Sequence, residues 1–100
     1  MILVRNIFQL KFGKSREALP VFKEGLDKMH KLGLGRAPAR LLTDVVASFY
    51  TVILEQTFES LAEFESLAKG LMANSEWQAW YQKLTPLIEA GRREIFTIVA

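Results

Sequence analysis

The last third of this 100-residue chain constrains its fold most strongly. Large apolar side chains recur there at the three- and four-residue spacing of an amphipathic helix. They are Trp77, Trp80, Tyr81, Leu84 and Ile88. Gly91 interrupts this pattern, and the residues that follow it, 93–99, are rich in the β-branched and aromatic types that favour strands. The sequence therefore predicts a helix that ends at Gly91 and leads into a C-terminal strand, so that a helix packs against a sheet.

A strand is also predicted at the other end of the chain, over residues 2–12. Every second residue of this segment is apolar, with Asn6 as the polar exception. The apolar positions are Ile2, Val4, Phe8, Leu10 and Phe12. A period of two is typical of a strand that turns one face to the core. The opposite face mixes polar and apolar residues, which indicates that it is partly covered too.

A helix is predicted between residue 15 and a glycine stop. Ser15 is the expected N-cap, and Gly33 or Gly35 is expected to end the helix in a left-handed conformation. The predicted inward stripe is Leu19, Phe22, Leu26 and Met29. Pro20 falls near the first turn, where a missing N–H costs least.

Two more strands are predicted over residues 36–46 and 48–58. Pro38 indicates that the first of these strands lies at the edge of the sheet or starts late, because proline has no N–H to donate to the hydrogen bonds between strands. Few residues join the two segments, so we expect an antiparallel hairpin.

The second helical region begins with a capping box, in which Ser60 and Glu63 each satisfy a backbone amide of the first turn. Asn74 and Ser75 break the apolar pattern and are expected to cap a second segment. Pro86 is expected to kink that segment before it ends at Gly91.

The resulting element order is β-α-β-β-α-β, with the second helix broken in two. This order predicts an α+β, ferredoxin-like fold: a four-stranded antiparallel sheet with helices on one face. One hundred residues suit one domain, so we assign residues 1–100 to a single ferredoxin-like domain.

Composition narrows the class of protein. Half of the residues are hydrophobic, which is a larger share than a single small core can bury. This surplus favours burial against a second copy of the chain. The net charge is +2, and no basic run with interleaved aromatics points to nucleic acid. The absence of cysteine excludes disulfides and Cys-ligated metal sites, and no apolar run reaches membrane length. We therefore expect a cytoplasmic homodimer with no cofactor, metal, nucleic-acid or membrane partner.

Five residues are candidates for a ligand pocket between the sheet and the helices: Asn6, Tyr50, Trp77, Trp80 and Tyr81. Asn6 is either a pocket donor or a structural amide satisfied by backbone or water. The aromatic residues of the helix either wall a pocket or anchor the core or a dimer contact. The sequence contains no serine triad, carboxylate pair, histidine cluster or phosphate-binding glycine loop, so catalytic residues remain unassigned.

Charged residues within predicted strands form a second candidate group: Arg5, Arg40, Asp44 and Glu55. They either form an ion-pair network at the sheet surface or a dimer contact, or they bind an anionic ligand. His30 is either a general base or an ordinary cation at a helix C-terminus. Arg92 and Arg93 follow the predicted helix stop and are expected to be solvated.

Several short segments resemble the dimeric α/β-barrel superfamily. They are Phe58-Glu-Ser-Leu-Ala-Glu-Phe64, Ser75-Glu-Trp77, Trp80 and Gly91-Arg-Arg-Glu-Ile95. The resemblance is to NIPSNAP-like proteins, with antibiotic-biosynthesis-monooxygenase-like proteins as neighbours. It implies that two sheets pair into one barrel across a two-fold axis.

The resemblance also bears on activity. Cofactor-poor monooxygenases and haem-degrading members of that superfamily carry a first-strand asparagine, a helix tryptophan and a histidine. Asn6 and Trp77 or Trp80 match the first two, but the sole histidine, His30, lies in the first predicted helix, so haem degradation is not implied. Two functional hypotheses follow: a homodimeric protein that binds a small apolar or aromatic molecule, or a cofactor-independent monooxygenase or isomerase. In the second, Asn6 and Tyr50 would hydrogen-bond the substrate and Trp80 would stack on it.

Overall fold

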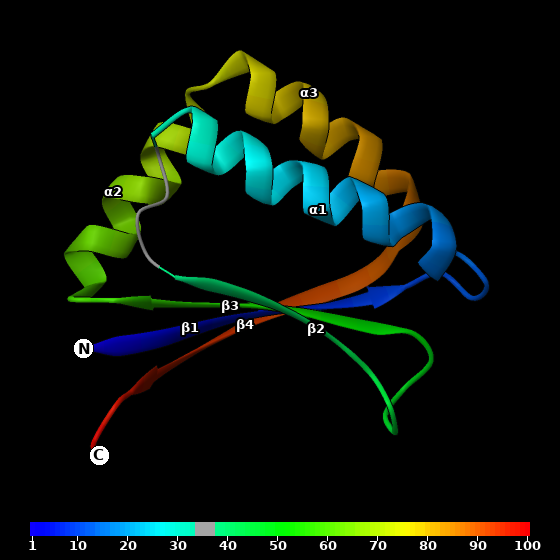
Figure 1. The fold of residues 1–100 in the computed structure, drawn as a ribbon, viewed down its shortest axis with the longest axis horizontal. Helices are drawn as coiled ribbons and strands as arrows, with labels where there is room; N and C mark the ends of the chain where they lie inside the picture. The colour runs from blue at the N-terminus through cyan, green and yellow to red at the C-terminus, as the bar shows by residue number, and fades with distance from the viewer. Residues whose placement is uncertain (34–37) are drawn as a thin grey trace.

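The computed structural model describes residues 1–33 and 38–100 and has helices on one side of a single sheet (Figure 1). Its elements, in chain order, are β1 (Ile2–Leu10), α1 (Ser15–Lys31), β2 (Ala39–Thr43), β3 (Thr51–Phe58), α2 (Leu61–Met72), α3 (Ser75–Leu84), the 3-10 helix η1 (Thr85–Leu87) and β4 (Ile88–Thr97). This arrangement confirms the predicted α+β, ferredoxin-like fold, including the break between α2 and α3.

The sheet has the order β2-β3-β1-β4, and every neighbouring pair is antiparallel. β1 is therefore a central strand, hydrogen-bonded on both sides. Its predicted alternation is confirmed, because Val4 and Leu10 are fully buried beneath the helices. The opposite face of the sheet carries no helix (Figure 1). Within the described residues, no helix is long and apolar enough to cross a membrane.

The predicted boundary between the last helix and the last strand was wrong. α3 ends at Leu84, and β4 begins at Ile88 rather than at residue 93. Pro86 accounts for the early stop, because it lies in η1 and cannot donate the N–H that a continuing helix needs. Gly91 is not a helix cap but a residue inside β4, paired with Phe8 of β1.

The other strands are shorter than predicted. β1 stops at Leu10, and the hairpin strands leave residues 44–50 as their connection. Here the Asp44 carboxylate accepts a hydrogen bond from Thr51 N at 2.8 Å, and the Ser48 carbonyl accepts one from the Thr51 hydroxyl at 2.6 Å. Such local bonds replace ladder pairing. The start of the predicted strand at residues 36–37 lies outside the described residues.

Two of the three predicted helix caps are confirmed. Ser60 Oγ accepts a hydrogen bond from Glu63 N at 3.2 Å, and Asn74 Oδ1 accepts one from Trp77 N at 3.0 Å. The Glu63 carboxylate accepts from Glu59 N, one residue before the amide expected for a capping box. Ser15 was wrongly assigned: Lys14 occupies the N-cap position, without a side-chain bond.

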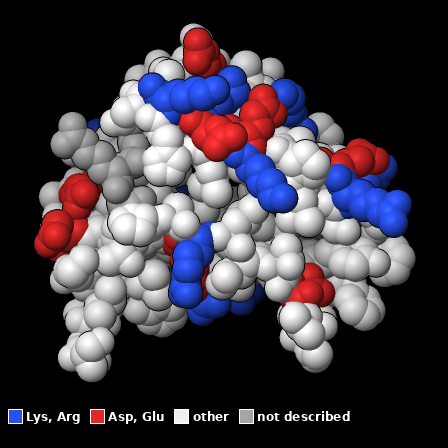
Figure 2. All heavy atoms as spheres, in the orientation of Figure 1, with Lys and Arg blue, Asp and Glu red and all other residues white. Residues whose placement is uncertain are grey.

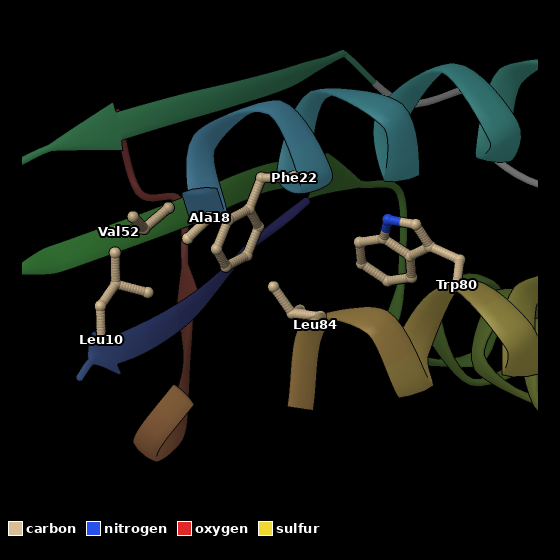
Figure 3. Packing of buried hydrophobic residues seen from close by; sticks show 6 residues of the cluster. All are labelled: Leu10, Ala18, Phe22, Val52, Trp80 and Leu84. Carbon is tan, nitrogen blue, oxygen red and sulfur yellow. The ribbon is translucent and has the colours of Figure 1, made fainter. Parts of the chain in front are cut away.

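Two separate hydrophobic clusters join the helices to the sheet. The larger comprises Leu10, Ala18, Phe22, Val52, Trp80 and Leu84, drawn from β1, α1, β3 and α3 (Figure 3). The smaller is built on Val4 and Phe58, with Phe64 and Leu67 of α2 packed on it. The stripe predicted for α1 is confirmed at Phe22 and Met29, which are buried, and Leu19 packs against the larger cluster. Leu26 lines the space between sheet and helices, and the small residues Ala18 and Gly25 are buried as well.

A pair of glycine substitutions tests the revised end of α3. Gly33 follows α1 at φ +67°, so Gly33→Ala should destabilise the protein by roughly 1–2 kcal/mol. Gly91 does not have a positive φ. A Cβ added there would lie 3.6 Å from Phe8 Cδ1, which is an ordinary contact distance. Gly91→Ala should therefore change the unfolding free energy by less than about 0.5 kcal/mol. Urea unfolding of both variants is the measurement, and a large loss for Gly91→Ala would contradict the strand assignment.

Candidate functional site

A cavity of about 650 Å³ lies between the sheet and the three helices, in the space between the two hydrophobic clusters. Pockets that hold small organic ligands typically measure about 300–1,000 Å³. The lining is mainly apolar and comes from the three α-helices and all four strands. Its members include Phe8, Phe22, Gly25, Leu26, Met29, Leu41, Leu54, Phe64, Leu67, Leu71, Trp77, Trp80 and Tyr81. The volume and the lining are those of a site for a small apolar molecule.

The floor of the cavity is a row of side chains that crosses three strands. Asn6 of β1 is paired with Leu54 of β3 on one side and with Arg93 of β4 on the other. Residues that face each other across antiparallel strands point to the same side of the sheet, here the helix side. The period of two and the register thus place these three side chains together under the helices.

Asn6 and Arg93 form a polar pair within this row. Arg93 Nε donates a hydrogen bond to Asn6 Oδ1 at 2.6 Å, and the Arg93 guanidinium lies 5.0 Å from the Phe64 ring centroid. This distance is suited to a cation–π contact. The partner of Asn6 is therefore a charged side chain, rather than the backbone or water that the structural interpretation assumed.

Gln56 is a polar floor residue that the sequence analysis did not single out. It lies on β3 on the same face as Leu54 and Phe58, only 4% of its surface is exposed, and it lines the cavity. Its Nε2 is buried and has no hydrogen-bond partner among the described residues. A buried amide donor without a partner costs about 1–3 kcal/mol. The alternation of β3 would have revealed Gln56 as the polar exception, just as it revealed Asn6 on β1.

Three of the predicted aromatic residues, Trp77, Trp80 and Tyr81, line the cavity from α3. Trp80 is buried, and its Nε1 donates to the Val21 carbonyl of α1 at 2.6 Å. Its ring lies 4.4 Å from the Trp77 ring, centroid to centroid. Trp80 thus joins α1 to α3 (Figure 3). Of the other two residues in the lining, Trp77 is half-buried and Tyr81 is exposed.

Tyr50, the fifth predicted pocket residue, lies apart from the other four. It precedes β3, packs against the larger cluster, and has its ring 5.6 Å from that of Phe12. It is not among the residues that line the cavity. His30 is exposed at the end of α1 and does not line it either.

The cavity is continuous with an opening beside β4. A second hollow, of about 460 Å³, shares Asn6, Phe8, Tyr81, Leu84 and Arg93 with it and extends along Thr85, Ile88, Gly91 and Arg92. Because Arg93 is exposed and lines both spaces, it lies at the mouth. A ligand entering between α3 and β4 would pass the Asn6–Arg93 pair first.

A row of alternating charges crosses the helix-free face of the sheet. In register order from β2 to β4 it runs Arg40, Glu55, Arg5 and Glu94. Glu55 is 7% exposed; its Oε1 accepts from Arg40 Nη2, and its Oε2 lies 3.1 Å from Arg5 Nε as an ion-pair contact. Arg5 also lies 3.6 Å from Glu94. The predicted ion-pair network at the sheet surface is confirmed for Arg5, Arg40 and Glu55. Asp44 is not part of it, because its carboxylate accepts the hydrogen bond from Thr51 N in the hairpin connection.

Neither protein-family models nor curated protein sequences give a match to this chain. Solved structures do. A NIPSNAP domain protein from Burkholderia xenovorans has a TM-score of 0.88 at 19% identity, over 100% of this chain and 96% of that one. A NIPSNAP family protein from Agrobacterium tumefaciens has a TM-score of 0.86 at 22% identity, over 98% of this chain and 92% of that one. This chain therefore shares its fold with NIPSNAP family proteins.

An antibiotic biosynthesis monooxygenase is a more distant structural neighbour of this chain, with a TM-score of 0.73 at 14% identity over 100% of both chains. The resemblance seen in the sequence is thereby confirmed at the level of fold. At these identities the similarity carries no substrate and no catalytic residue, because one fold serves many functions.

The contact between Gly25 and Trp80 offers a test of how the cavity roof is held. A Cβ at Gly25 would fall 2.3 Å from Trp80 Cζ2, far inside contact distance. Gly25→Ala should therefore destabilise the protein by about 1–3 kcal/mol, because the indole must move. Lys23→Ala, at an exposed position of the same helix, is the control and should change little. Thermal unfolding of both variants is the measurement; equal stability would show that α1 and α3 are not fixed by this contact.

Proposed function

We propose that this protein is a homodimer that binds a small apolar or aromatic molecule in the cavity between its sheet and its helices. The observation that carries this proposal is the cavity itself, with an apolar lining and two amide side chains, Asn6 and Gln56, at its floor. Pockets that orient small molecules are typically apolar with a few placed polar groups. The lack of cysteine fits a cytoplasmic location, which we include in the proposal.

Binding would draw its free energy from apolar burial. Each Å² of apolar surface removed from water contributes about 25 cal/mol, and the aromatic rings of Trp77 and Tyr81 offer flat surfaces for a ring to stack on. The unpartnered Gln56 Nε2 would gain an acceptor from a bound ligand, which would remove the cost of its burial. The site thus favours a ligand with an apolar body and at least one acceptor atom.

The helix-free face of the sheet supports the homodimer part of the proposal. Exposed apolar residues surround the charge row: Val45, Val46 and Phe49 in the hairpin connection, and Phe96, Ile98 and Val99 near the C-terminus. Both segments project beyond this face at opposite ends (Figure 1), and Figure 2 shows no Lys, Arg, Asp or Glu at their tips. Large exposed apolar areas of this kind mark interfaces.

The charge row fits a second copy of itself. A two-fold axis that lies between the faces, parallel to the strands, reverses the order of the row in the partner. Arg40 would then face Glu94 of the other copy, and Glu55 would face Arg5, so that every charge meets its opposite. Isologous contacts of this self-complementary kind are the commonest in homo-oligomers.

A cofactor-independent monooxygenase or isomerase is the alternative, and the fold shared with an antibiotic biosynthesis monooxygenase supports it. Such chemistry begins when a base removes a proton from the substrate. In the part of the chain that the structure describes, no Asp, Glu, His or Lys side chain lines the cavity. This lining favours binding over proton abstraction by the protein.

Filling the cavity tests the binding proposal. Ala68 lines the cavity on α2, whereas Ala62 is exposed on the same helix and does not line it. Ala68→Phe should weaken binding of the neutral fluorophore N-phenyl-1-naphthylamine by about tenfold or more, a loss of about 1.4 kcal/mol, while Ala62→Phe should leave it unchanged. Fluorescence titration provides the affinities. Equal affinities for both variants would place the bound dye outside the cavity.

Two charge insertions of matched exposure test the dimer. Phe96 is 48% exposed and is paired with Leu3 on the helix-free face, whereas Leu61 is 50% exposed at the start of α2. Sedimentation of the unmodified protein at micromolar concentration should show a dimer. Phe96→Glu should convert it to a monomer, because a carboxylate would be buried without a partner, and Leu61→Glu should not. A monomeric unmodified protein would refute the proposed dimer.

A further inference from the structure

We propose that the ligand is a carboxylate: an apolar or aromatic body in the cavity with its carboxylate group bound at Arg93. This inference rests on the proposed function, since it specifies the ligand class of the same cavity. It follows from which hydrogen-bonding atoms at the floor and the mouth are still free and what charge they carry.

Arg93 is the one charged side chain among the described residues that line the cavity. It also differs from the other arginines of the sheet. Arg5, Arg40 and Arg92 each lie within 4.0 Å of a carboxylate, whereas Arg93 makes no such ion pair over residues 1–33 and 38–100. A strand arginine that faces an apolar cavity without a carboxylate partner has its charge available for an anionic ligand.

The Asn6 contact fixes which part of the guanidinium is free. Nε of Arg93 donates to Asn6 Oδ1, and the guanidinium carbon of Arg93 lies over the Phe64 ring. The two terminal nitrogens, Nη1 and Nη2, therefore keep their N–H groups for a ligand. Two such parallel donors match the two oxygens of a carboxylate.

The neighbouring amides reinforce this preference. Because Asn6 Oδ1 already accepts from Arg93, Asn6 has its Nδ2 donor left to offer. Gln56 offers the buried Nε2 that lacks a partner. Asn6 Nδ2 and Gln56 Nε2 are thus two donors beside a positive charge, an arrangement that suits a negatively charged acceptor.

The position of Arg93 at the mouth limits the cost of binding an anion. Transferring a carboxylate from water to an apolar interior is unfavourable unless the charge is paired. Here the carboxylate would stay near the exposed guanidinium between α3 and β4, while the apolar body lies deeper among the rings of α3. The site therefore separates the two ends of the ligand by polarity.

A matched pair of probes tests this inference: the fluorescent acid 2-anthracenecarboxylate and its methyl ester, which has the same rings without the charge. At about pH 7.5, where the acid is ionised, the intact protein should bind the acid about tenfold more tightly than the ester. Arg93→Met should bring the ratio of the two affinities close to one. It should leave the affinity for the ester unchanged, which also shows that the variant is folded. Arg16→Met is the control, because Arg16 is exposed on α1 and lines neither the cavity nor the hollow beside β4; it should keep the ratio.

The outcomes separate this inference from the proposed function. If the ester binds as tightly as the acid to the intact protein, or if Arg93→Met keeps the ratio, the carboxylate inference is overturned and cavity binding stands. If Arg16→Met removes the ratio as fully as Arg93→Met does, a general surface charge accounts for it and the inference is again overturned. If neither probe binds, and the neutral naphthylamine does not bind either, both the carboxylate inference and the proposed function fail.

Discussion

The register of β1 is the constraint on which the rest of this structure depends. β1 is paired on both sides, so its alternation decides which side chains of β3 and β4 share a face with it. That one register assembles Leu54, Asn6 and Arg93 under the helices and Arg40, Glu55, Arg5 and Glu94 on the other side. A slip of β1 by one residue would turn over its own side chains, taking Asn6 away from the helices and placing Arg5 beneath them. The cavity floor and the proposed dimer face are thus two consequences of the same pairing.

The helix layer stays far enough from the sheet to leave a cavity because its contacts are divided. The larger cluster joins α1 and α3 to one end of the sheet, and the smaller joins α2 to the other. The indole of Trp80 fills the space between α1 and α3, where Gly25 admits it. An ion pair between Lys83 and Glu24, at 2.8 Å, adds a surface contact between the same helices. The Lys83 hydrogen bond lowers the pKa of Glu24 below its usual value.

Much of this fold could be predicted from the sequence, because its signals are local. The alternation in β1, the caps at Ser60 and Asn74 and the stop at Gly33 are each encoded within a few residues. The end of α3 was misassigned because Pro86 and Gly91 are both plausible stops, and helical spacing continues by coincidence to Ile88. Arg93 was predicted only to be solvated, for a related reason: its hydrogen bond to Asn6 joins residues 87 positions apart, and only the register reveals it. Long-range pairing is the information that local patterns lack.

The central claim is that the space between sheet and helices is a ligand site. The most direct measurement is a crystal structure of the protein grown with N-phenyl-1-naphthylamine, inspected for electron density of the fused rings. We predict density between α3 and the sheet, against Trp77 and above Asn6, with the side chains of the larger cluster unmoved. Density confined to the helix-free face, with helices closed onto the sheet and no space left between them, would contradict the account.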